Sequence, residues 1–136
     1  MVFVATFQFT FADAKVLVQG LRPLRPSDIA PLIGQEKSHD AYDGFRKLVS
    51  EILNETPLRS IQVDSELNFI FVTVRLLDDE CIAMQKYFRS MSAAQLESSS
   101  LSQMSVKKFL RLKDELLNRL QKASTIIDNP YQSFES

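Results

Sequence analysis

Ten residues near the start of the chain carry the strongest structural constraint in the sequence. Between residues 2 and 11, large apolar side chains alternate with smaller or polar ones. A period of two places successive side chains on opposite faces of a β-strand. One face carries Phe3, Ala5, Phe7, Phe9 and Phe11, and the other carries Val2, Val4, Thr6, Gln8 and Thr10. Because phenylalanine buries a large apolar area, we expect the first face to pack on the core and the second to be partly covered.

Three further segments have strand-like patterns. Residues 15–19 (KVLVQ) predict a short strand that forms a hairpin with the first strand, with a turn at Asp13. Residues 59–63 and 67–76 predict two more strands, joined by a tight turn over residues 64–66. The segment 67–76 is apolar on both faces, which is typical of a central strand buried on both sides.

The remaining segments divide into one long loop and three helices. Residues 20–35 contain three of the five prolines and two of the three glycines, which predicts a connecting loop in which Ser27 could cap a single helical turn over residues 28–32. A helix is expected from Ser38 or Asp40, either of which can cap it, to just before Pro57. A second helix is expected from Asp78 and Asp79 to about Ala94, with an apolar stripe that includes Cys81, and a third over residues 102–126.

This order of elements predicts an α+β fold. We expect a three- to four-stranded antiparallel or mixed sheet, packed by helices on one face, with a long C-terminal amphipathic helix. Residues 1–128 are expected to form one domain, in line with the chain length of 136 residues. Residues 129–136 are expected to form a mobile tail that follows the stop signal at Asn129 and Pro130.

Composition argues against several classes of function. The 16 basic and 17 acidic side chains give a net charge of −1, so no overall field draws the chain to nucleic acid or to a membrane. No apolar run approaches the roughly 18 residues of a membrane helix. One cysteine and one histidine cannot form an internal disulfide or a closed zinc site. We therefore expect a soluble cytoplasmic protein without a metal or another cofactor.

Few residues suggest catalytic chemistry. His39 lies beside Asp40 and could act as a general base, but no catalytic motif with diagnostic spacing accompanies it. Cys81 follows three acidic residues, which oppose the lowering of a thiol pKa by a helix N-terminus. The sequence therefore predicts no catalytic residues and argues against an enzyme, although a site assembled from scattered residues would leave no such signal.

Two arginines indicate a candidate site for an anion. Arg22 and Arg25 precede a turn at Ser27, where a short helical N-terminus would add backbone donors. Arginines are also common in ordinary connecting loops. The pair therefore supports an alternative function, in which the chain binds or acts on a small anionic ligand.

The C-terminal helix is the strongest candidate for a functional surface. Its apolar seam is formed by Phe109, Leu112, Leu116, Leu120 and Ile127. A basic stripe that includes Lys108, Arg111 and Arg119 lies opposite, interrupted by Glu115, and is typical of a solvated face. We expect a small non-enzymatic protein-interaction module, such as an adaptor, regulator or assembly subunit. Its partner would be another protein, or a second copy in a homodimer, bound through the seam. The sequence equally allows the seam to pack inside the chain's own fold.

Overall fold

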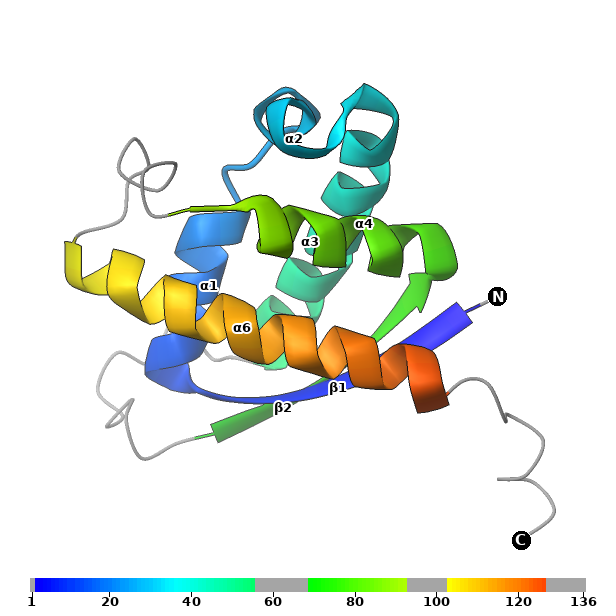
Figure 1. Cartoon of the computed structure of the whole chain (residues 1–136). Coiled ribbons are helices and arrows are strands. Elements are labelled where there is room, and N and C mark those ends of the chain that lie inside the picture. The colour runs from blue at the N-terminus through cyan, green and yellow to red at the C-terminus, as the bar shows by residue number, and fades with distance from the viewer. Residues whose placement is uncertain (1, 56–68, 93–102, 127–136) are drawn as a thin grey trace, which may run out of the picture.

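The computed structural model describes residues 2–55, 69–92 and 103–126. These residues form two strands and five helices, which confirms the α+β class. The elements in chain order are β1 (Val2–Thr10), α1 (Phe11–Leu21), α2 (Pro26–Ile33), α3 (Gln35–Glu55), β2 (Phe69–Leu77), α4 (Asp78–Ser90) and α6 (Gln103–Ile126). Figure 1 shows the helices gathered on one side of the two strands.

In the part of the chain that the structure describes, the sheet consists of β1 and β2 in antiparallel pairing. The register runs from Val2 opposite Leu77 to Thr10 opposite Phe69. The alternation predicted for the first strand is confirmed, because Ala5, Phe7 and Phe9 are buried while their sequence neighbours Val4, Thr6 and Gln8 are exposed. The inner face of β2 completes this layer with Ile70, Val72, Val74 and Leu76.

The prediction that both faces of the second long strand are buried is wrong. The burial of β2 alternates strictly, and Phe69 and Phe71 on its outer face are 53% and 64% exposed. An apolar outer face therefore does not by itself indicate a second covering layer. The predicted strand over residues 59–63 and the turn after it lie outside the described residues, so the expected third and fourth strands are not confirmed there.

The predicted strand over residues 15–19 is wrong, because these residues belong to α1. The hydroxyl of Thr10 accepts a hydrogen bond from the backbone N–H of Asp13 at 3.1 Å, which caps the helix. Leu17, Val18 and Leu21 are buried at helical spacing. The turn expected at Asp13 is thus the first turn of a helix.

The predicted loop over residues 20–35 also contains a helix, α2. Pro26 is the first residue of α2, a position whose backbone N–H has no partner within a helix. The missing N–H of proline therefore costs no hydrogen bond there. The carboxylate of Asp28 accepts from the N–H of Arg25 at 3.0 Å and fixes the entry to the helix. Gly34, with a φ of 94°, ends α2. The next helix begins at Gln35, a few residues before the predicted start, and Ser38 donates to the carbonyl oxygen of Gln35 at 2.6 Å.

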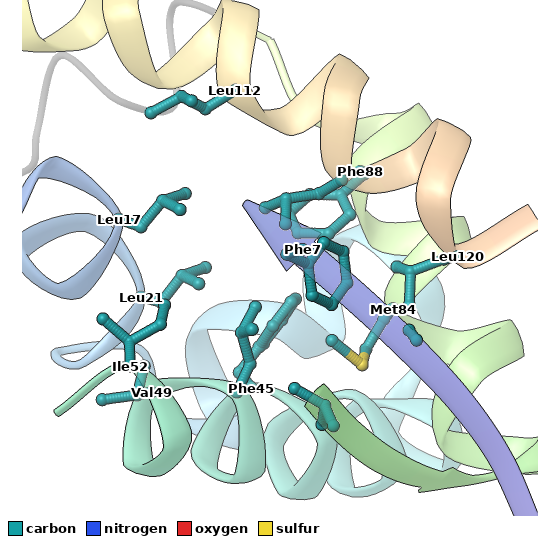
Figure 2. Close-up of a cluster of buried hydrophobic side chains, with 14 of the residues drawn as sticks. Phe7, Leu17, Leu21, Phe45, Val49, Ile52, Met84, Phe88, Leu112 and Leu120 are labelled. Atoms are coloured by element: carbon teal, nitrogen blue, oxygen red, sulfur yellow. The ribbon is translucent and has the colours of Figure 1, made fainter. Parts of the chain in front are cut away.

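The core lies between the inner face of the sheet and the helices. Figure 2 shows Phe7 of β1 surrounded by side chains from α3, α4 and α6. Phe45 of α3 forms an edge contact with Tyr87 and a tilted contact with Phe88, at centroid distances of 5.3 and 5.4 Å. Such aromatic pairs add to the stabilisation from buried area. The apolar stripe predicted for α4 is confirmed for Cys81, Met84 and Phe88, which are all buried. The helix ends at Ser90, before the predicted end near Ala94, so the buried Met91 follows α4 in an extended conformation.

Candidate functional site

The apolar seam of α6 faces the core. Phe109, Leu112, Leu116 and Leu120 are each 0% exposed, and α6 contacts β1, α4 and α1. Figure 2 shows Leu112 and Leu120 directed toward the other core side chains. Ile127 lies outside the described residues. These four side chains therefore have no surface that a partner could contact while α6 keeps its place, because the fold itself uses the seam.

Polar groups on α6 also fasten it to the rest of the fold. The carboxylate of Asp13 lies 3.4 Å from both Lys108 Nζ and Arg111 Nη2. The ammonium of Lys113 donates to the carbonyl oxygens of Phe88 at 3.2 Å and Met91 at 3.3 Å, at the end of α4. The basic stripe predicted on this helix therefore includes two residues that bind the chain's own α1.

A hollow of about 320 Å³ lies between the end of α1 and one side of α3. Two arginines that are far apart in sequence border it, Arg22 after α1 and Arg46 on α3. The other described residues of its lining are Leu21, Leu24, Tyr42, Phe45, Val49, Ser50, Leu53 and Asn54. The hollow thus combines two guanidinium groups, three neutral polar side chains and an apolar wall.

Arg46 is held in place by Tyr42, one helical turn before it. Its Nη1 donates to the phenol oxygen of Tyr42 at 3.0 Å, and its guanidinium carbon lies 5.6 Å from the centre of the ring. This is the geometry of a cation–π contact. Arg22 is placed by the end of α1, where its backbone N–H donates to the carbonyl of Val18 at 2.9 Å. The side chain of Arg46 is therefore oriented by an aromatic ring, whereas for Arg22 it is the backbone that is fixed.

The structure separates the two arginines that the sequence paired. Arg22 lines the hollow, whereas Arg25 is absent from the described lining and caps α2 through its backbone N–H. Arg46 takes the second basic position instead. The four-residue spacing from Tyr42 to Arg46 is visible in the sequence. The position of Arg46 on the same hollow as Arg22, however, depends on how α1 packs on α3.

A second hollow, of about 460 Å³, lies between α3 and β2 and shares Arg46 and Ser50 with the first. Its lining carries the positive charges of Arg46, Lys47 and Arg75, and carboxylates balance part of this charge. Glu51 lines it, and Lys47 forms an ion pair at 2.6 Å with Glu80, whose side chain is 5% exposed. The first hollow is thus the stronger candidate for an anion, because its described lining contains no carboxylate.

The other candidate groups are not assembled into a site. His39 is exposed at the start of α3. Beside it, partial burial and then neighbouring carboxylates raise the pKa of Asp40 above its ordinary value of 3.8, and these neighbours are Asp79, Asp43, Glu80 and Glu36. The thiol of Cys81 is buried and accepts a hydrogen bond from Gln85 Nε2 at 3.3 Å.

Within residues 2–55, 69–92 and 103–126, His, Cys, Asp and Glu side chains form no cluster suited to a metal ion. Among the helices of these same ranges, none has the length and apolar character needed to cross a membrane.

Comparison of the chain with protein-family models, with curated proteins and with solved structures found no match.

Proposed function

We propose that this chain is a binding protein for a small amphipathic anion, held in the hollow between α1 and α3. The ligand class is a carboxylate or phosphate monoester with an apolar body. The observation that carries the proposal is the convergence of Arg22 and Arg46, from different elements, on one hollow with an apolar wall. Guanidinium groups are the side chains best suited to bind carboxylate and phosphate oxygens.

The size and lining of the hollow agree with such a ligand. A volume of about 320 Å³ falls at the lower end of the range for small-molecule sites, which are mostly apolar with a few polar groups. Leu21, Phe45 and Val49 are buried residues that form part of its wall. They would contact the apolar body, while Ser50 and Asn54 add hydrogen-bonding groups at the rim.

Both arginines are exposed and none of the described lining residues is acidic. Arg46 also gives its Nη1 proton to a neutral phenol, so its positive charge is not cancelled. An anion would therefore meet two positive charges at the mouth of the hollow, with no carboxylate in the described lining. Because Arg46 is already oriented by Tyr42, part of the entropic cost of ordering its side chain has been met before binding.

Calorimetry with matched probes tests the proposal. Hexyl phosphate and hexanoate carry both the anion and the apolar body, whereas hexanol lacks the charge and inorganic phosphate lacks the body. We expect the two amphipathic probes to bind more tightly than either partial probe. No binding of any probe in the millimolar range, or equal binding of hexanol and hexyl phosphate, would reject the proposed ligand class.

Three arginine variants locate the site. Arg22→Gln and Arg46→Gln should each weaken hexyl phosphate about 10-fold or more, since a hydrogen bond to a charged group contributes about 1.5–3 kcal/mol. Arg25→Gln is the matched control, because this arginine lies in the same segment but not in the described lining. If Arg25→Gln weakens binding as much as the other two, the hollow is not the site.

A further inference from the structure

The two hollows described above adjoin along one turn of α3. Arg46 and Ser50 line both of them, and these two residues are one helical turn apart on the exposed side of the helix. The first hollow extends from this turn toward α1. The second extends toward β2, where Thr73, Val74 and Arg75 contribute to its lining. A ligand bound in the first hollow therefore has a second polar hollow beside it.

The second hollow has an excess of positive charge. Its described lining contains Arg46, Lys47 and Arg75 against the carboxylate of Glu51. Both arginines are exposed, so they can reach a bound ligand. This excess contrasts with the net charge of −1 of the whole chain. Because guanidinium and ammonium groups form their strongest hydrogen bonds with carboxylate and phosphate oxygens, the lining favours an anionic group.

Lys47 is held at the edge of the second hollow by a buried carboxylate. Its ammonium lies 2.6 Å from Oε1 of Glu80, whose side chain is 5% exposed. The same oxygen accepts a hydrogen bond from the backbone N–H of Leu77 at 2.8 Å. The side chain of Lys47 is still 43% exposed, and an ammonium has three N–H donors. The ion pair therefore orders Lys47 while leaving it accessible to a ligand.

Arg46 can contact an anion on either side. A guanidinium has five N–H donors in one plane, and the phenol of Tyr42 accepts from Nη1. The cation–π contact with the same ring holds the guanidinium in place. Because the donors of a planar guanidinium point in different directions, the other nitrogens can serve two anionic groups at separate positions.

We propose that the ligand has two anionic groups joined by an apolar spacer, with one group in each hollow. Arg22 and Arg46 bind the first group, and Lys47 and Arg75 bind the second. The methylene stem of Arg46 offers the spacer apolar surface between the two. The chemical class is an organic bisphosphate or a phosphorylated carboxylic acid. This inference rests on the proposed function, which requires only the group in the first hollow.

The covalent link between the two groups is what makes the second hollow effective. A separate anion would have to bind there against the carboxylate of Glu51 and beside an anion already bound to Arg46. A group tethered to the first anion instead binds at a high effective concentration. We therefore expect the second hollow to act as an extension of the first rather than as an independent site.

Calorimetry with 1,6-hexanediol bisphosphate tests for the second anionic group. The matched probe is 6-hydroxyhexyl phosphate, which has the same spacer and a hydroxyl in place of the second phosphate. We expect the bisphosphate to bind about 10-fold or more tightly, because hydrogen bonds to charged groups are the strong ones. Two equivalent ends alone give a statistical gain of only about two-fold. A gain no larger than this overturns the inference.

Arg75→Gln locates the second group. Arg75 lines the second hollow and is absent from the described lining of the first. The variant should weaken the bisphosphate about 10-fold and hexyl phosphate by less than about two-fold, because salt screens its effect on the first hollow. Arg25→Gln, outside both described linings, is the control and should change neither probe. Equal effects of Arg75→Gln on the two probes, or no effect on the bisphosphate, overturn the assignment.

Glu51→Gln gives a test in the opposite direction. Removing this carboxylate from the second hollow should tighten the bisphosphate by roughly two- to five-fold, the size expected for a partly exposed charge interaction. Hexyl phosphate should bind as it does to the wild type, because Glu51 is absent from the described lining of the first hollow. Weaker binding of the bisphosphate would mean that Glu51 binds the ligand, and would overturn the second anionic group.

The proposed function and this inference can fail separately. If Arg22→Gln weakens hexyl phosphate but the second phosphate adds nothing to the wild type, the proposed function stands and the two-anion ligand is overturned. If neither hexyl phosphate nor the bisphosphate binds, both are overturned. Binding of the bisphosphate that depends on Arg75 but not on Arg22 would place the anion in the second hollow alone, and would also overturn both.

Discussion

Gly20 on α1 lies directly against the aromatic ring of Phe109 on α6, so close that a methyl group at position 20 would overlap two ring carbons. The ring is completely buried and cannot swing away into solvent. Gly44 on α3 has a similar relationship with Met84 on α4. Two helix pairs of the core are thus in contact at positions where a methyl group would have to displace the neighbouring side chain.

Gly20→Ala should destabilise the fold even though alanine is the better helix former. Overpacking costs about 1–3 kcal/mol, whereas the gain in helix propensity is about 1 kcal/mol. We expect a net loss on the order of 1 kcal/mol in the free energy of unfolding, measured by urea denaturation. Gly44→Ala should cost less, because the flexible side chain of Met84 can adapt. A Gly20→Ala protein as stable as the wild type would contradict the close packing of α1 on α6.

Leu116→Ala distinguishes a core helix from a partner-binding helix. Leu116 is 0% exposed, so the substitution should lower the free energy of unfolding by about 2–5 kcal/mol. Glu115→Ala, on the exposed neighbour, should change it by less than about 0.5 kcal/mol. A stable Leu116→Ala protein with weakened binding to a partner would instead support the seam as an interaction surface.

Lys113 should contribute to stability through the end of α4. Its ammonium donates to two carbonyl oxygens there, which helices otherwise leave without partners. Lys113→Met keeps most of the aliphatic stem and removes both hydrogen bonds, and we expect a loss of about 1–2 kcal/mol. Lys107→Met, at an exposed position of the same helix, is the control. Equal denaturation midpoints for the two variants would show that Lys113 does not stabilise this helix end.

Tyr87 should make the fold sensitive to alkali. Burial, and to a lesser extent the charge of Asp28, raise the pKa of Tyr87 from 10.0 to about 12. Between these values the unfolded chain loses the phenol proton while the folded chain keeps it, so the free energy of unfolding falls as the pH rises. The loss should approach the order of 2 kcal/mol at pH 12. Tyr87→Phe should show a smaller decline over the same pH range, and an unchanged profile would mean that Tyr87 titrates normally in the fold.

The elements that could be predicted from the sequence are those whose local pattern admits one interpretation. The alternation along β1 and the buried stripe Cys81, Met84 and Phe88 of α4 belong to this group. Residues 15–19 do not, because five residues can satisfy a strand pattern and a helix pattern together. The cap formed by Thr10 and Asp13, a few residues earlier, resolves that ambiguity in favour of the helix.

Of the two arginines at the candidate site, only one could be predicted from the sequence. Arg22 has a local signal, since it lies in a segment with a second arginine and a turn. Arg46 reaches the hollow because α3 packs beside α1, and no local pattern encodes that approach. The exposure of Phe71 could not be predicted for the same reason. The hydrophobicity of a strand indicates which side chains favour burial, but it does not indicate whether a second layer covers them.

The pairing of β1 with β2 has a consequence for biosynthesis. Translation delivers β1 first, and its partner strand follows only after α1, α2 and α3 have been made. At ordinary elongation rates of about 5–20 residues per second, a strand rich in phenylalanine stays without its hydrogen-bonding neighbour for several seconds beside the ribosome. Its apolar face and both of its edges are then open to other nascent chains. Slower synthesis between α3 and β2 should therefore increase aggregation of the newly made protein.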